Sequence, residues 1–215
     1  MRSITLSCAA IALGLSTACV AQDRGWEVGG AVGFGIMRNA TIDNASGAAT
    51  AGLDNRFVAG AVVGQDLYQH FSGELRYVFR DNDLVLKNGG QKVNMDGDSH
   101  LVHYDVLFHP TNKESRIRPF VAAGGGIRLF RATGQEYVSQ PFSDFALLTR
   151  TNEVKPLISV GGGVKAKLTD HTVIRVDFRE YISPFPEELF ATAPGAKIRG
   201  WLFDSVPMAG VSFVF

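Results

Sequence analysis

Residues 26–36 read WEVGGAVGFGI and alternate between two kinds of side chain. Apart from Gly30, the even positions hold large apolar residues, from Trp26 to Phe34 and Ile36. The odd positions hold Glu27 and then only glycine and alanine. A period of two is typical of a β-strand, so this stretch predicts a strand with one apolar face and one small, polar face.

The same alternation returns along the whole chain, and no amphipathic helix of credible length interrupts it. Two of the segments, 56–67 and 118–130, show it less clearly, the first being apolar on both faces and the second glycine-rich. The pattern therefore predicts an all-β protein. Its eight predicted strands are 26–36, 56–67, 71–87, 91–109, 118–130, 156–168, 172–181 and 200–215.

The segments that connect these strands alternate in length. Short connectors follow the second, fourth and sixth strands, and long connectors follow the first, fifth and seventh. The third strand ends in the tight turn signal Asn88-Gly89-Gly90 at the tip of two unusually long strands. Short turns at one end and long excursions at the other are the signature of a barrel of the bacterial outer membrane. The short connectors are 68–70, 110–117 and 169–171, and the long ones are 37–55, 131–155 and 183–199.

Two barrels could satisfy this pattern, and they differ in which face points inward. A soluble barrel of the lipocalin type would turn its apolar face inward, whereas a membrane barrel would turn it toward lipid. The charged face also carries the small residues of the first strand, which suits a narrow interior. Closure further satisfies every backbone polar group, as a bilayer demands. The sequence therefore predicts an eight-stranded antiparallel up-and-down transmembrane β-barrel.

Composition excludes several other classes of protein. The 215 residues carry 21 basic and 21 acidic side chains, so the formal net charge of zero disfavours a nucleic-acid partner. Apolar residues make up 46% of the chain, which excludes general disorder. No apolar stretch is long enough for a membrane-spanning helix, and two cysteines cannot build a disulfide scaffold.

The N-terminus predicts a cleaved signal peptide over residues 1–21, leaving residues 22–215 as the barrel. Arg2 precedes a short apolar region, and Cys19-Val20-Ala21 places small residues at the cleavage-determining positions. Cleavage after Ala21 removes both cysteines and leaves 20 bases and 21 acids. The alternative is a lipoprotein cut before Cys19, although Ser16 stands where a branched apolar residue is expected.

Inward-facing charges are the first candidate site. A functional reading is a gated polar conduit, and the alternative is an ion-pair network that fills the lumen. Eight strands leave an interior only wide enough for side chains, which favours the network. The predicted members are Glu74, Arg76, Asp105, Arg128, Lys165, Arg175, Asp177, Arg179 and Asp204.

Catalytic chemistry has little support in the sequence. The glycine runs 124–126 and 161–163 lack the Gly-Lys-Ser/Thr of a phosphate loop. His103 shares a face with Asp105, as an oriented base or, as we expect, an interior hydrogen-bonded pair. No serine or cysteine nucleophile is placed by the pattern. We expect no catalysis and no cofactor.

Four aspartates on the long hairpin form a second candidate site. A two-residue turn at Asn88-Gly89 would place Asp81 opposite Asp96, whereas a four-residue loop would place Asp81 opposite Asp98 and Asp83 opposite Asp96. Like charges directly opposed are unfavourable in a sheet, so these carboxylates are either solvated and splayed apart or gathered around a divalent cation such as Ca²⁺.

The chain ends in Gly210-Val-Ser-Phe213-Val-Phe215, which resembles the C-terminal assembly signal of bacterial outer-membrane proteins. Met208 departs from the polar residue usual at the first position of that signal. Residues 71–77, FSGELRY, and 175–179, RVDFR, resemble the OmpA/OmpX-type family of small barrels. The resemblance implies insertion into the outer membrane by the barrel-assembly machinery, and it implies no specific activity.

Aromatic residues are expected to mark the two membrane interfaces. Strand direction places Trp26, Phe71, Phe108 and Phe215 at one rim, and Phe34, Phe79, Tyr181 and Trp201 at the other.

The sequence thus predicts an outer-membrane barrel without catalysis, with a structural, envelope-protecting or loop-mediated binding and adhesion role. The expected partners are outer-membrane lipid and lipopolysaccharide, the barrel-assembly machinery and an extracellular ligand, but no nucleic acid. The alternative is a small-solute or ion channel, and a third hypothesis is a lipid-modifying enzyme.

Overall fold

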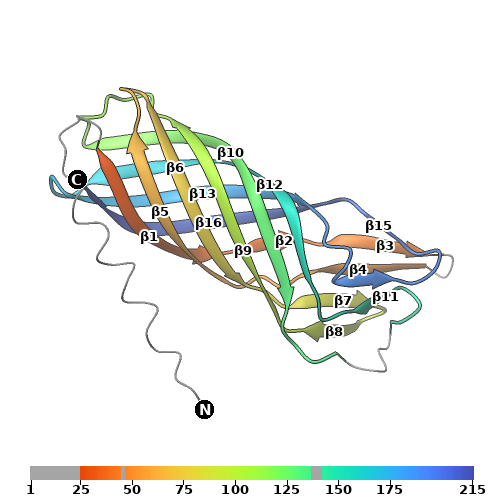
Figure 1. Ribbon diagram of the computed structural model, residues 1–215. Helices are drawn as coiled ribbons and strands as arrows, with labels where there is room; N and C mark the ends of the chain where they lie inside the picture. The colour runs from red at the N-terminus through yellow and green to blue at the C-terminus, as the bar shows by residue number, and fades with distance from the viewer. Residues whose placement is uncertain (1–24, 45–46, 137–141) are drawn as a thin grey trace, which may run out of the picture.

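Each main strand pairs with the next one in antiparallel fashion, and the last returns to the first (Figure 1). The computed structural model describes residues 25–44, 47–136 and 142–215. The ring closes where Glu27 pairs with Val214 and Gly33 with Met208. The eight barrel strands are β1 (Trp26–Phe34), β5 (Phe57–Asp66), β6 (Phe71–Asp81), β9 (Gly97–Phe108), β10 (Ile117–Ala132), β12 (Asn152–Lys167), β13 (Thr172–Pro184) and β16 (Trp201–Val214).

The predicted fold class, an eight-stranded antiparallel up-and-down barrel, is confirmed. A short strand, β2 (Ile36–Arg38), follows β1 and pairs with β16. No helix in the described part of the chain is long and apolar enough to cross a bilayer. The predicted signal peptide lies outside the described residues and stays a prediction.

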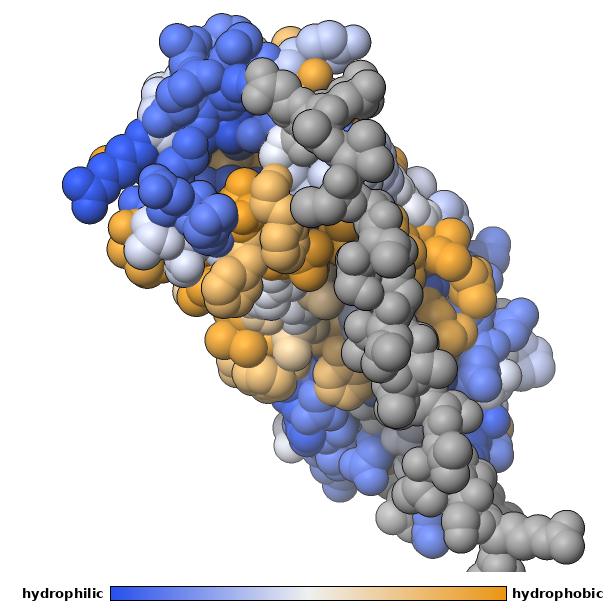
Figure 2. All heavy atoms as spheres, turned by 60° about the vertical axis from the view of Figure 1, so that its left-hand side comes forward, coloured by the Kyte–Doolittle hydropathy of each residue, from blue (hydrophilic) through white to orange (hydrophobic). Residues whose placement is uncertain are grey.

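Burial alternates along every barrel strand, and the apolar face points outward. On β13, Val176 is 60% exposed while the next residue, Asp177, is 3% exposed. Figure 2 shows the result on one side of the molecule, where an apolar belt separates two hydrophilic ends. This is the arrangement of a barrel that faces lipid, opposite to that of a soluble one.

Aromatic residues lie near both ends of this belt. Phe71 and Phe108 pack against each other with ring centroids 5.4 Å apart, and Trp26 is exposed at the same end of the barrel, at the start of β1. Trp201 is exposed toward the opposite end. The prediction for Tyr181 is wrong, because its side chain is fully buried inside the barrel against His103.

The two ends of the barrel differ in construction. At one end lie the tight turns 67–70, 109–116 and 168–171 together with Gly25 and Phe215, and we call this the short-turn end. The long connectors gather at the other end, which we call the cap end (Figure 1).

The long connectors and the tip of the long hairpin fold together into a cap, which the alternation of apolar residues did not predict. A five-stranded sheet has the strand order β15-β3-β4-β7-β8, and a second small sheet pairs β11 with β14. These strands are β3 (Ala40–Asn44), β4 (Gly47–Leu53), β7 (Leu84–Asn88), β8 (Gln91–Met95), β11 (Ala146–Leu148), β14 (Phe190–Thr192) and β15 (Lys197–Arg199).

The cap has an apolar core. One face of its larger sheet is buried through Ile42, Leu84 and Leu86, while the neighbouring positions Thr41 and Lys87 are exposed. The core is completed from the smaller sheet and the loops by Phe142, Phe145, Leu148, Phe185, Leu189 and Phe190. The same period of two therefore turns apolar residues outward in the barrel and inward in the cap.

The long hairpin leaves the barrel and joins the cap. Its strands are interrupted at Asn82–Asp83 and at Asp96, so the predicted strands 71–87 and 91–109 are each two strands. The two central turn residues are Gly89 and Gly90, with φ of 55° and 82°, so the expected turn at Asn88-Gly89 is wrong by one residue. Left-handed conformations at both positions favour glycine.

Candidate functional site

Four charged side chains from β6 and β13 meet in the middle of the lumen. Arg175 donates from Nη1 to Glu74 Oε2 at 3.0 Å and from Nη2 to Asp177 Oδ2 at 2.7 Å. Arg76 donates from Nη2 to Glu74 Oε1 at 2.6 Å and to Asp177 Oδ2 at 2.8 Å. All four are buried, and their formal charges cancel. Such pairing satisfies groups that would be costly to bury alone.

A second group lies beside this one. Arg179 Nη1 is 2.8 Å from Asp105 Oδ2, and the other carboxylate oxygen of Asp105 is 3.1 Å from His103 Nδ1. Ser159 donates its hydroxyl proton to Asp105 at 3.4 Å. His103 and Asp105 are fully buried, so this histidine is one partner of an interior hydrogen-bonded pair rather than a base at an open site.

Toward the cap end, one carboxylate serves two guanidinium groups. Asp204 accepts hydrogen bonds from Arg80 and, at 3.1 Å, from Arg128. Arg128 also donates to Ser99 Oγ at 3.0 Å, and its Cζ lies 4.6 Å from the ring centroid of Phe130. Phe130 belongs to the apolar core of the cap. The charged side chains of the lumen are therefore in direct contact with the apolar core of the cap.

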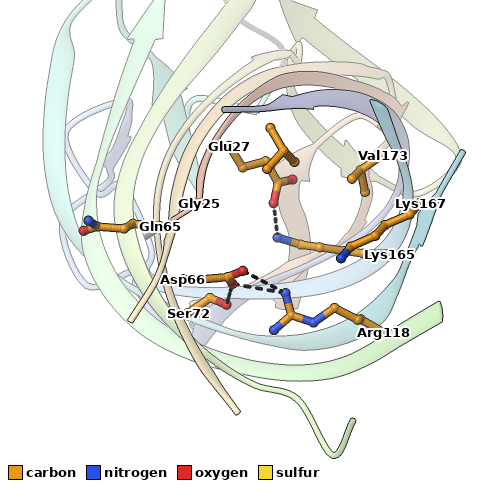
Figure 3. Close-up of a pocket in the computed structure, with 10 residues that line it drawn as sticks. Gly25, Glu27, Gln65, Asp66, Ser72, Arg118, Lys165, Lys167 and Val173 are labelled. Atoms are coloured by element: carbon orange, nitrogen blue, oxygen red, sulfur yellow. Dashed lines mark hydrogen bonds and ion pairs between the residues drawn. The ribbon is translucent and has the colours of Figure 1, made fainter. Parts of the chain in front are cut away.

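At the short-turn end the lumen opens into a small cavity of about 60 Å³, which we call the mouth cavity. Figure 3 shows side chains projecting into it from opposite walls. Lys165 Nζ is 2.5 Å from Glu27 Oε2, and Arg118 Nη1 is 3.1 Å from both carboxylate oxygens of Asp66. The cavity is lined by Gly25, Glu27, Gln65, Asp66, Ser72, Arg118, Lys165, Lys167, Val173 and Val214.

A hydrogen-bonded chain closes one side of the mouth cavity. Ser72 donates to Asp66 Oδ1 at 2.6 Å, and its Oγ lies 3.0 Å from His109 Nε2. His109 Nδ1 lies 3.2 Å from the carbonyl oxygen of Pro119, and a neutral ring has one N–H to donate, either to that carbonyl or to Ser72 Oγ. Burial and the positive charges of Arg118 and Lys165 lower the pKa of His109 to about 4, which keeps the ring neutral at neutral pH.

The structure places all nine predicted lumen residues inside the barrel, and each has at least one oppositely charged partner. Sequence reasoning left Arg80 and Glu27 out of the set, although both lie on the charged face. It also missed the chain through Ser72 and His109, because no local spacing connects residues 37 positions apart.

The four hairpin aspartates are not gathered into a cation site. Asp81 lies opposite Asp98, but Arg56 binds both Asp81, at 3.1 Å, and Asp83. Arg131 binds Asp98 through Nε at 2.7 Å and Nη2 at 2.8 Å. Across the described ranges, no group of three or more potential ligands could hold a metal ion. Burial and Asp96 raise the pKa of Asp83 in spite of Arg56.

Gly210 and Phe213 of the predicted assembly signal lie on the last strand, β16, at the seam of the barrel, and Phe215 directly follows that strand. Phe213 is 56% and Phe215 77% exposed, and the main-chain nitrogen of Phe215 donates to the carbonyl oxygen of Trp26 at 2.9 Å. A Cβ atom at Gly210 would collide with the carbonyl oxygen of Gly30 on β1. Close packing against β1 therefore explains the glycine at position 210, independently of any recognition signal.

Comparisons with known proteins agree with this architecture. No family model matches the chain, and no curated protein matches it either. Among solved structures, Neisserial surface protein A (NspA) is similar, with 12% identity, a TM-score of 0.52, and coverage of 90% of this chain and 100% of that one.

The solid-state NMR structure of outer membrane protein AlkL in lipid bilayers is equally similar. Its identity is 12%, its TM-score is 0.52, and the match covers 88% of this chain and 90% of that one. At such identities the likeness shows the fold alone. The expected resemblance to small bacterial outer-membrane barrels is therefore confirmed at the level of the fold.

Proposed function

We propose that this chain is an outer-membrane barrel that conducts no solute and acts through its cap, which faces the exterior of the cell. Its role is to bind an extracellular ligand or surface, or to protect the envelope, without catalysis. Outer-membrane lipid and lipopolysaccharide surround the belt, and the barrel-assembly machinery inserts the chain.

The observation that carries the proposal is that two separate layers close the barrel, the ion pairs across its lumen and the apolar core of the cap. Ion pairs such as Arg175–Glu74 cross the lumen between strands that are not neighbours. Beyond them, Phe130 and the other cap residues form an apolar core over the cap end. A molecule built as a conduit would leave a polar path through both layers, and a channel is therefore the weaker candidate.

The cap also has the features of a binding platform. Its larger sheet buries one face, and the opposite face, beyond the buried Val85, presents polar side chains without disturbing the core. Lys87 pairs with Lys92 across the hairpin, and Thr50 pairs with Lys87 on the next strand. Both lysines are exposed, although Lys92 lies 2.6 Å from Asp54 Oδ2. Outer loops that fold stably lose less entropy on binding than loose ones.

A deletion strain tests this function. The strain is complemented with the parent, with a Lys87→Ser/Lys92→Ser variant of the cap surface, and with a control variant, Glu114→Ser/Asp170→Ser, whose exposed residues lie at the short-turn end. Adhesion and detergent sensitivity are measured. We expect the control to restore the parental phenotype and the cap variant to fall short of it. If adhesion and detergent sensitivity are the same in the deletion strain and in all complemented strains, the proposal is wrong.

A further inference from the structure

The mouth cavity carries an excess of positive charge. Three cationic side chains line it, Arg118, Lys165 and Lys167, against two carboxylates, Glu27 and Asp66. The histidine behind Ser72 adds no charge, because its ring is neutral at neutral pH. Three cations and two anions leave one formal positive charge in a space of about 60 Å³. An enclosed surplus of this kind favours an anionic occupant.

Arg118 keeps donors that no residue in the described ranges uses. Its side chain is buried, with 6% exposure, and Nη1 binds both oxygens of Asp66. Nε and Nη2 have no hydrogen-bond partner there and are themselves buried, so an anion reaches them only when the side chains around them shift. These two nitrogens form the side edge of the guanidinium group, whose paired N–H bonds match two oxygens of a phosphate or carboxylate. A buried guanidinium with three of its five N–H donors unused is costly unless something accepts from them.

The lysines add two further donors from β12, the strand that pairs with Arg118 on β10. Lys165 Nζ binds Glu27 at 2.5 Å and lies 3.7 Å from Glu74, so it is fixed in place. Lys167 donates to the carbonyl oxygen of Lys113 at 2.7 Å, which holds its ammonium group near the opening while leaving its other protons free to donate. A tetrahedral oxyanion offers enough oxygens to accept from all three cations.

We propose that the mouth cavity binds a phosphate group through Arg118, Lys165 and Lys167. The cavity is too small for more than a compact anion or the head of a larger molecule. It lies beside Gly25 and Val214, next to the exposed aromatic side chains of Trp26 and Phe215, which mark the short-turn rim. The phosphate could therefore be free in solution or be the headgroup phosphate of a phospholipid in the adjoining leaflet.

Calorimetric titration of the refolded full barrel in phosphate-free detergent tests the site. Sodium phosphate is titrated at constant ionic strength into the parent, Arg118→Gln and Lys167→Met, with Lys197→Met, at an exposed position in the cap, as the matched control. We expect saturable binding by the parent and Lys197→Met, and at least tenfold weaker binding by the other two variants. Arg118→Gln removes the cation that binds Asp66 and can fail to fold for that reason. Lys167→Met then still tests the site.

A parallel titration with dihexanoyl-phosphatidylglycerol below its micellar concentration identifies the source of the phosphate. Binding of inorganic phosphate alone supports the site with a free anion as its ligand. Binding of the lipid, with or without inorganic phosphate, supports it with a headgroup as its ligand, provided that Lys167→Met weakens the binding. No saturable binding of either probe, or equal binding by the parent and Lys167→Met, would overturn the proposal.

Discussion

Arg175 on β13 and Glu74 on β6 meet across the lumen, with Nη1 3.0 Å from Oε2, although their strands are not adjacent in the sheet. Asp177 and Arg76 complete the crossing from the same two strands. The interior of the barrel is thus held together by side chains as well as by the hydrogen bonds of its wall. This cross-lumen network makes definite predictions about stability.

Replacing Arg175 or Asp177 by leucine should destabilise the folded barrel, because each change removes one of the partners of a buried opposite charge. Breaking a buried pair typically costs about 3–5 kcal/mol. We expect a lower urea midpoint for each variant, with insertion retained, and a smaller loss in the double variant than the sum of the two. Lys92→Met, whose side chain is exposed, is the control. Parental midpoints for both single variants and the double variant would show that the network contributes nothing.

Deleting Phe215 should impair assembly. Phe215 is the most exposed of the large apolar residues in the described chain, so its side chain supports little packing, yet the predicted signal requires a terminal aromatic. We expect unfolded protein to accumulate in the periplasm, measured by loss of the heat-modifiable band. Replacement by tyrosine is the control and should assemble normally. Normal heat-modifiable protein in the outer membrane after the deletion would refute the prediction.

His109 should make the barrel sensitive to acid. Its pKa is lowered from 6.5 to about 4 in the folded state, so between these values the unfolded chain binds a proton that the folded chain does not. The stability that His109 contributes is therefore complete above pH 6.5 and is lost as the pH falls toward 4. The difference between the two pKa values corresponds to about 3 kcal/mol.

The measurement is the free energy of unfolding in urea at pH 7.5 and 4.5. We expect the parent to lose more stability between the two than His109→Gln, which cannot titrate at this position. His171→Gln, at an exposed position in another turn, is the control and should follow the parent. Equal losses in parent and His109→Gln would contradict the assignment.

The cap should loosen independently of the barrel. Leu86 is 1% exposed in the cap core, and truncation of a buried leucine to alanine costs about 2–5 kcal/mol. We expect trypsin to cut Leu86→Ala at Lys87 or Lys92 faster than it cuts the parent, while the heat-modifiable barrel survives. Thr50→Ala, on the outer face of the same sheet, should resemble the parent. Simultaneous loss of cap and barrel would show that they unfold as one unit.

Much of the barrel could be predicted because a period of two assigns each residue of a strand to one of two faces. Glu74, Arg76 and Asp177 were placed inside on this ground alone. Tyr181 shows the limit of reasoning from residue type, since an aromatic near a rim was assigned to the belt although its odd position puts it with Arg179 inside. The alternation along the strand therefore predicts the direction of the Tyr181 side chain better than the residue type does.

The cap could not be predicted from the same pattern. Its strands are three to seven residues long, and pairings such as that of Lys197 with Asp43 join segments distant in the sequence. The hairpin register likewise depends on one residue, because moving the turn from Asn88-Gly89 to Gly89-Gly90 changes the partner of Asp81. Ion pairs with Arg56 and Arg131 then decide what the carboxylates bind, and both arginines lie outside the hairpin.

The most direct test of the account is the conductance of the refolded protein in a planar bilayer. A barrel closed by ion pairs across its lumen and by the apolar core of the cap should give no stable unitary steps, whatever the sign of the applied voltage. Glu74→Ala combined with Arg175→Ala should open space in the lumen without a continuous path, because the cap remains in place, and should also stay silent. Stable unitary steps from the parent protein would contradict the central claim and favour a channel.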